Sequence, residues 1–156
     1  MGPDDGRLGE NKYKNHHNRE GLNVCANAYI GKLADGTTAI YQALPWDYRC
    51  WLSGSATNGN ANRLGFVGFE ICEDNLKDKN YFDNVVMNLS VNLVAYLCLK
   101  YGLTINEVFD HKELHDKGLA SNHGDITHWL KKYNLTMNDY RAAVLQAMQE
   151  GVTVTY

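Results

Sequence analysis

Hydrophobic and polar residues show no regular pattern at the start of the chain, but a regular one follows. Residues 1–24 are polar and contain glycine, without the periodicity of a helix or a strand. Three apolar stretches that predict β-strands come next: residues 24–31, 38–44 and 65–72. The pair Asp35-Gly36, between the first two stretches, is typical of a hairpin turn. We therefore expect an irregular N-terminal segment, 1–24, and one folded domain, 25–150.

Apolar residues at helical spacing predict two helices in the second half of the chain. The first covers residues 82–101, and Gly102 fits the position just past its end. The second covers residues 137–150, with Thr136 as its N-cap. Between the helices the pattern predicts a short strand at residues 108–109. The alternation of strands and helices indicates an α/β domain with a mixed central β-sheet flanked by helices.

Composition and charge limit the classes of function. The chain has 156 residues, of which 44% are hydrophobic and 21% charged, enough for one globular domain with a core. A net charge of −3 argues against binding nucleic acid through phosphate contacts. No apolar run reaches the roughly 18–20 residues that span a bilayer, and the start lacks the features of a signal peptide. We therefore expect no nucleic-acid partner, no membrane span and a cytoplasmic location in the producing cell.

Histidines are concentrated near one predicted loop, residues 111–125. Four of the six fall within 18 residues: His111, His115, His123 and His128. A histidine at a strand end and a second ligand in the following loop commonly hold zinc. The spacing from His111 to His123 matches no recognised zinc motif, so a histidine-rich surface loop is the alternative. The four cysteines form no CxxC pair, which excludes a zinc ribbon.

Glu70 interrupts the third predicted strand, in the run GFVGFEIC. Burying an unpaired carboxylate costs several kcal/mol, so this side chain must leave the core or find a partner. If it faces a metal site, it can act as a base or hold a substrate group. Otherwise it pairs with a lysine or arginine, or it reaches solvent. The residues leave both interpretations open.

Four segments together resemble one enzyme family. They are ADGT (34–37), LPWD (44–47), GFVGFEICED (65–74) and HKELHDKGLASNHGDITHW (111–129). The chain resembles the zinc-dependent N-acetylmuramoyl-L-alanine amidases, and among them the endolysin branch of phages and prophages, over residues 2–144. The resemblance implies the peptidoglycan-recognition-protein fold and zinc as the cofactor. It also implies hydrolysis of the amide bond between N-acetylmuramic acid and L-alanine in peptidoglycan.

The same resemblance implies roles for individual residues. His111 matches a zinc ligand at the end of a strand. Asp125 matches the third ligand, with His123 as the other candidate. Glu70 would orient water or substrate, and Lys117 would stabilise the developing oxyanion. The groove that binds peptidoglycan or a muropeptide is expected to contain Tyr29, Trp46, Trp51 and Asn60.

The chain departs from the family at the first zinc histidine. In the family this histidine lies on an opening strand that the sequence does not contain, and His16 and His17 match a later family histidine. Because that strand is central in the family, we expect an open sheet edge and an apolar gap. Three explanations stay open. The N-terminal segment pairs at the edge, a partner covers it (as in a homodimer), or the chain is a fragment.

Two functions follow from this mixture of matches and departures. The first is zinc-assisted hydrolysis of the cell wall. The second is an inactive amidase fold that binds, and so sequesters, a muropeptide or another small ligand. Two further replacements favour the second function. The hairpin strand reads Ala26-Asn27-Ala28 where the family often has a histidine, and Leu52 stands in place of the histidine of a Trp-His-Ala-Gly motif.

Overall fold

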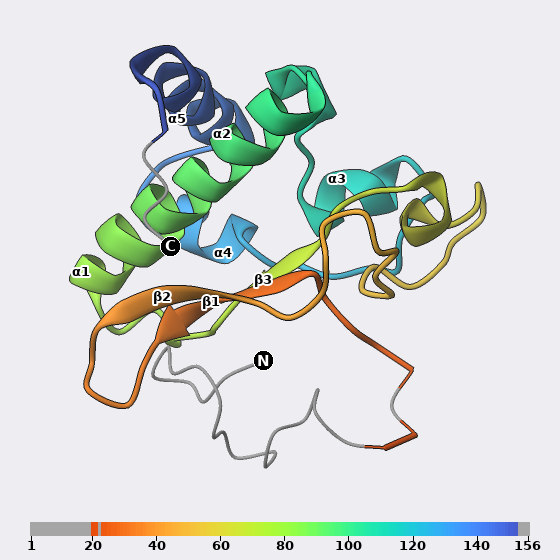
Figure 1. Ribbon diagram of the computed structural model, residues 1–156, viewed down its shortest axis with the longest axis horizontal. Coiled ribbons are helices and arrows are strands. Elements are labelled where there is room, and N and C mark those ends of the chain that lie inside the picture. The colour runs from red at the N-terminus through yellow and green to blue at the C-terminus, as the bar shows by residue number, and fades with distance from the viewer. Residues whose placement is uncertain (1–19, 22, 153–156) are drawn as a thin grey trace.

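The computed structural model describes residues 20–21 and 23–152 of the chain. His16 and His17, and most of the segment 1–24 that the sequence predicts to be irregular, lie outside the described residues. Within the described part, the helices gather on one side of a small sheet (Figure 1). The fold is therefore of the α/β class, as the sequence predicts.

The sheet is mixed and has three strands in the order β2-β1-β3. β1 (Ala28–Lys32) and β2 (Thr38–Gln42) are antiparallel and form the predicted hairpin. Gly36 adopts a φ of 85° in the turn, a conformation that glycine reaches without the strain of a side chain. β3 (Phe69–Ile71) pairs with β1 in the parallel direction. Each strand is shorter than the apolar stretch that predicts it.

A continuous helix of 23 residues, Lys79–Tyr101, packs against the sheet and forms the centre of the core. Its hydrogen bonding divides it into α1 (Lys79–Tyr81), the π-helical segment η2 (Phe82–Leu89) and α2 (Ser90–Tyr101). Asp78 caps the start by accepting a hydrogen bond from the backbone N–H of Asn80, and Gly102 ends the helix as predicted. By length and hydropathy alone this helix could cross a membrane, but over half of its apolar window is buried inside the domain.

α5 (Met137–Glu150) packs along α2 and matches the range predicted from the sequence. Thr136 is its N-cap, as predicted, and forms a capping box with Asp139. Tyr140 and Val144 are the buried residues of the helix. The Tyr140 hydroxyl lies 2.8 Å from the hydroxyl oxygen of Ser90, which satisfies two polar groups inside the core.

The strand predicted at residues 108–109 is wrong. These residues follow a short 3₁₀-helix, η3 (Ile105–Glu107), and pair with no strand among the described residues. Thr104 and Glu107 form a capping box that starts η3. This local cap, together with the Val108 N–H that donates to the Ile105 carbonyl, favours a turn over the β propensity of the apolar pair.

The loop predicted over residues 111–125 is wrong in its first half, which forms α3 (His111–Asp116). The Asp110 carboxylate accepts the Glu113 N–H at 2.7 Å, and the Glu113 carboxylate accepts the Asp110 N–H at 3.3 Å. His111 is therefore the first residue of a helix rather than the end of a strand. A further short helix, α4 (Thr127–Lys132), follows this segment. Both helices are too short and polar to show a clear helical period.

β3 is an open edge of the described sheet, because β1 is its only strand neighbour within that part of the chain. Residues 66–71 line a cavity together with Val94 of α2 and with Met137 and Tyr140 of α5. The described residues therefore contain a sheet edge with a cavity beside it, and what covers this edge stays a prediction. The short helix η1 (Ala61–Leu64) lies in the loop that leads to this edge.

Candidate metal and catalytic site

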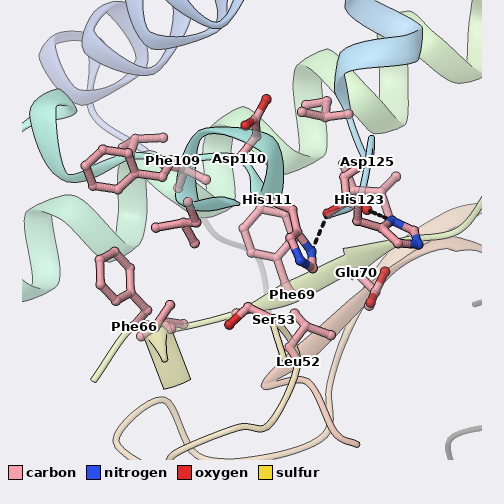
Figure 2. Close-up of a pocket in the computed structure, with 18 of the residues that line it drawn as sticks. Leu52, Ser53, Phe66, Phe69, Glu70, Phe109, Asp110, His111, His123 and Asp125 are labelled. Carbon is pink, nitrogen blue, oxygen red and sulfur yellow. Dashed lines mark hydrogen bonds and ion pairs between the residues drawn. The ribbon is translucent and has the colours of Figure 1, made fainter. Parts of the chain in front are cut away.

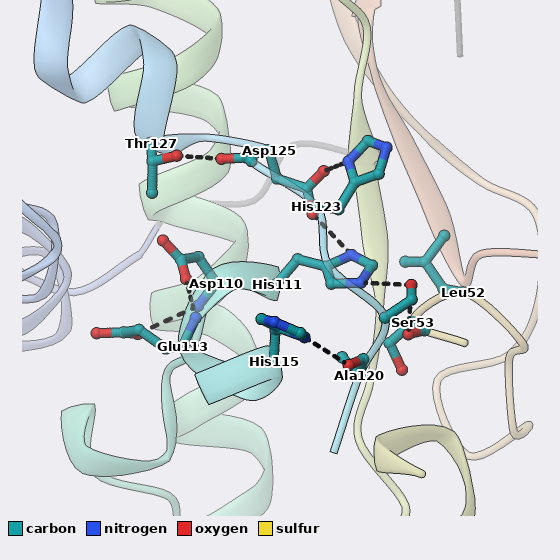
Figure 3. Close-up of polar contacts among 12 residues, drawn as sticks. Leu52, Ser53, Asp110, His111, Glu113, His115, Ala120, His123, Asp125 and Thr127 are labelled. Carbon is teal, nitrogen blue, oxygen red and sulfur yellow. Dashed lines mark hydrogen bonds and ion pairs between the residues drawn. The ribbon is translucent and has the colours of Figure 1, made fainter. Parts of the chain in front are cut away.

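Two histidines and one aspartate meet beside this cavity (Figure 3). His111 is the first residue of α3, and His123 and Asp125 lie in the loop before α4. The Nδ1 atom of His111 is 2.9 Å from Asp125 Oδ2, and the Nδ1 atom of His123 is 2.6 Å from Asp125 Oδ1. One potential ligand atom from each residue lies within 4.8 Å of the others. The structure thus brings both of the alternatives that the sequence left open, His123 and Asp125, to His111.

Local hydrogen bonds hold the His111 ring in place. The capping box of α3 fixes the backbone from which this side chain starts. On the far side of the ring, Nε2 lies 3.3 Å from the Ser121 hydroxyl, which in turn donates to the Ser53 carbonyl at 3.3 Å. A histidine whose second nitrogen is engaged in this way is oriented as metal-binding histidines usually are.

Charges within the cluster shift the pKa values of its members. Burial raises the pKa of the Asp125 carboxyl, but hydrogen bonds and charge from His111, then from His123, outweigh burial and bring the pKa below its usual value. The hydrogen bond with Asp125 raises the pKa of His111, against the effect of desolvation. A divalent cation would compete with these protons for the same nitrogen and oxygen atoms.

Glu70, on β3, lies beside the two histidines and Asp125 (Figure 2). Desolvation, followed by the negative charge of Asp125, raises the pKa of Glu70 to about 7. His123 and His111 act in the opposite direction. The carboxyl group therefore faces the cluster rather than a lysine or arginine among the described residues. This position favours the interpretation that Glu70 acts at a metal site over the interpretation that it forms an ion pair or reaches solvent.

The cavity beside the cluster has a volume of about 410 Å³ (Figure 2). Its wall is mainly apolar and includes Leu52, Phe66, Phe69, Phe109 and Trp129. Three buried polar atoms on this wall, the Ser53 hydroxyl, Asp110 Oδ2 and His128 Nε2, have no partner in hydrogen-bond geometry among the described residues. An apolar pocket with a few convergent polar and titratable groups is typical of a small-molecule binding site.

The chain matches the family model of N-acetylmuramoyl-L-alanine amidases over residues 2–136. It belongs to this amidase family. No curated protein and no solved structure matches it. Membership of the amidase family supports peptidoglycan as the class of substrate and hydrolysis as the class of reaction.

The donor set of the cluster fits the metal that amidases of this family typically use. Zinc in proteins is bound by imidazole nitrogen and by carboxylate oxygen, and catalytic zinc sites usually have three protein ligands. His111, His123 and Asp125 supply two nitrogens and one carboxylate in close proximity. The described residues of this chain therefore contain a suitable set of protein donors.

Lys117 is not among the residues that line the cavity. It ends α3, and its ammonium group lies 5.0 Å from the centre of the Phe109 ring. Its backbone carbonyl accepts a hydrogen bond from Asn58 at 2.8 Å. The oxyanion role expected for Lys117 stays a prediction that its position in this structure does not support directly.

The four expected groove residues also lie outside the lining of the cavity. Trp46 lines a second, neighbouring cavity, and Trp51 is half-buried with the Arg63 guanidinium 5.9 Å from its ring. Asn60 is buried and accepts a hydrogen bond from Asn62 at 2.7 Å. Tyr29 is on β1, where burial raises the pKa of its hydroxyl to about 12. The substrate contacts expected of them stay predictions.

Two polar residues of the site had no role in the sequence interpretation. Asp110 caps the helix that begins with His111, and Ser121 contacts the His111 ring. The first could have been found from the sequence, because Asp110 and Glu113 have the spacing of a capping box. The second could not, because nothing local to Ser121 indicates which side chain it meets.

Proposed function

We propose that this protein is a zinc-assisted peptidoglycan amidase that hydrolyses the bond between N-acetylmuramic acid and L-alanine. The observation that carries the proposal is the cluster of His111, His123 and Asp125 beside an apolar cavity, with Glu70 next to it. Family membership supports the class of bond and substrate. The resemblance to phage and prophage enzymes extends the proposal to an endolysin, which reaches the cell wall on release from the producing cell.

His123 has a particular part in this proposal. Among the described residues, His111 and Asp125 match two of the zinc ligands that the family resemblance implies. Because His123 Nδ1 lies 2.6 Å from the same carboxylate that His111 contacts, it is in a position to act as the third donor. We therefore assign zinc binding to His111, His123 and Asp125 together.

Zinc, when bound, polarises a carbonyl group and lowers the pKa of water. Residues of the chain itself transfer the proton and exclude water. The Glu70 carboxyl, which lies beside the cluster, can accept a proton from water and return it to the leaving amine. The apolar wall that includes Phe66, Phe69 and Phe109 excludes bulk water and packs against the substrate.

One observation favours a second candidate, a protein that binds a muropeptide without cleaving it. Leu52 lines the cavity at the position where the family resemblance expects a groove histidine, so the wall is apolar at this point. The cavity would then still bind an apolar or amphipathic ligand. This candidate needs no zinc and predicts no hydrolysis.

Zinc content and hydrolysis, measured on the same purified chain, separate the two candidates. We expect about one zinc ion per chain in the wild type and a marked loss in His111→Ala, because metal binding depends on every ligand. His115→Ala is the matched control, since His115 lies on the same helix outside the cluster. Release of the alanine amino group from purified peptidoglycan measures hydrolysis. Zinc-loaded protein that releases none contradicts the amidase function and favours the binding protein.

A further inference from the structure

Two acidic neighbours, Glu73 and Asp74, follow β3 and hold successive residues of α4. The Asp74 carboxylate accepts a hydrogen bond from the Trp129 indole N–H at 2.7 Å. Glu73 Oε2 lies 2.8 Å from His128 Nε2 in an ion pair, a contact of opposite charges whose angles are not those of a hydrogen bond. All four residues belong to the segments that carry the family resemblance, and Glu73, His128 and Trp129 line the cavity, yet the proposed function gives none of them a part in zinc binding.

His128 also contacts the loop before α4, which contains His123 and Asp125. Its Nδ1 atom contacts the backbone carbonyl oxygen of Asp125. Since a carbonyl oxygen only accepts, His128 must carry a proton on Nδ1 and donate it. The same ring therefore meets Glu73 on one side and the loop before α4 on the other.

The carbonyl group that His128 contacts belongs to a strained part of the backbone. Asp125 has a φ of 32°, in the left-handed region that side chains other than glycine rarely adopt. Such a conformation persists only when surrounding contacts hold it. The orientation of this residue decides where its carboxylate points, and both oxygens of that carboxylate meet a histidine of the cluster.

We propose that His128 is a positioning residue for Asp125, with Glu73 holding the His128 ring from behind. The inference rests on the proposed function only in taking Asp125 as a zinc ligand. The chain of contacts runs from Glu73 through His128 to the Asp125 backbone, and from the Asp125 carboxylate to His111 and His123. Outer contacts of this kind typically change metal affinity by about 10- to 100-fold.

The neighbouring contact of Trp129 separates this role from simple anchoring of the helix. Trp129 and Asp74 are almost completely buried, at 3% and 2% exposure, and their hydrogen bond fastens α4 to the segment after β3. Asp74 also accepts the backbone N–H groups of Leu76 and Asp78, at 3.1 Å each. Because these buried contacts do not involve His128, its replacement should leave the fold intact.

The test replaces His128 by each of two amides in the full-length chain. The side-chain nitrogen of asparagine lies near the place of Nδ1, whereas that of glutamine lies near the place of Nε2. His128→Asn can therefore still donate to Asp125, and His128→Gln can only reach Glu73. His115→Gln is the matched control, because His115 Nδ1 also lies near a backbone carbonyl, that of Ala120, at 3.1 Å.

The measurement is the zinc dissociation constant, by competition with a chromophoric chelator, beside a thermal melt of each variant. We expect His128→Gln to weaken zinc binding about 10- to 100-fold, and His115→Gln to change it by less than about threefold. His128→Asn and Glu73→Gln both lose the charged contact with Glu73 but keep a donor to Asp125, so each should weaken zinc binding by about three- to tenfold. Equal zinc affinity in the wild type and His128→Gln overturns the proposal. Equal losses of affinity and melting temperature in both His128 variants also overturn it, since they indicate a structural role.

Failure of this inference is distinct from failure of the amidase proposal. A wild type that binds zinc but hydrolyses no peptidoglycan removes the enzymatic function and leaves the affinity comparison valid. Unchanged affinity in the His128 variants of an active enzyme removes only the positioning role. A wild type that binds no zinc overturns both. If His128→Gln does not fold, the zinc titration of His128→Asn and Glu73→Gln tests the positioning role instead. A Glu73→Gln chain with the zinc affinity of the wild type counts against the proposal.

Discussion

The core helices and the segment that carries the site are stabilised in different ways. α2 and α5 pack through buried apolar side chains, such as Ala95 and Val144, each with 0% exposure. The segment from η3 to α4 also buries apolar residues, such as Trp129 and Leu130, but its short helices and its loop depend in addition on side chains that bond to backbone groups. Asp110 starts α3, and His128 contacts the Asp125 carbonyl. Apolar packing spreads stability over many weak contacts, whereas each of these polar contacts is a single directed bond.

This difference indicates how the two regions should respond to substitution. A change in the core should alter the free energy of unfolding and leave metal binding almost unchanged, because the cluster lies at the ends of short helices and in a loop. A change in a directed bond of the site should alter metal binding or catalysis more than it alters stability. Three predictions, in decreasing order of the expected effect, test the comparison.

Glu70→Gln should affect catalysis and stability in opposite directions. Loss of a general base typically lowers the rate about 100-fold or more. Burial raises the folded-state pKa of Glu70 from 4.5 to about 7, so its favourable contribution is present below pH 4.5 and is lost as the pH rises through 7. The ionised group therefore destabilises the fold at pH 8 by at most about 3 kcal/mol, and the neutral glutamine avoids this cost.

The measurement for Glu70→Gln is denaturant unfolding with a chelator present, at pH 4 and at pH 8, beside an assay of hydrolysis. The variant should be more stable than the wild type at pH 8 and similar to it at pH 4. A variant that hydrolyses peptidoglycan at the wild-type rate would show that Glu70 is only structural. A variant without any gain in stability at pH 8 would contradict the raised pKa of the partly buried Glu70.

Val144→Ala should destabilise the fold without weakening zinc binding. The side chain is completely buried between α5 and the rest of the core, so its truncation leaves a cavity and costs about 1–3 kcal/mol. Leu145→Ala is the matched control, because the neighbouring Leu145 is 41% exposed. Denaturant unfolding and zinc titration measure the two effects. A marked loss of zinc affinity in Val144→Ala would mean that core and site are not separable.

Asp110→Ala and Thr136→Ala remove the same kind of helix cap from the two regions. Each should lower the free energy of unfolding by about 1 kcal/mol, the usual contribution of an N-cap. Only Asp110→Ala should weaken zinc binding, by about tenfold, because α3 begins with His111 while α5 carries no member of the cluster. Equal zinc affinities in the two variants would show that the cap does not position His111.

Local patterns of the sequence predict the parts of this protein that depend on near neighbours in the chain. The hairpin at Asp35-Gly36, the long helix that ends before Gly102, and α5 with its cap at Thr136 all appear where the sequence predicts them. The sequence analysis does not predict α3 and η3. Their capping boxes are the only local signal of a helix, and their few residues show no periodicity. The concentration of histidines singled out His111 and His123, and the family resemblance added Asp125 and the ligand roles.

Only the tertiary structure decides the contacts between distant segments. It brings His123 to the same carboxylate as His111, it surrounds Glu70 of β3 with the charges of the loop before α4, and it leaves Lys117 against Phe109. The physical reason is the range of the interactions. Periodicity, turns and caps act over a few residues, and the sequence alone determines them. The pKa of a carboxyl group and the distances within a metal site depend on which surfaces meet when the helices pack on the sheet.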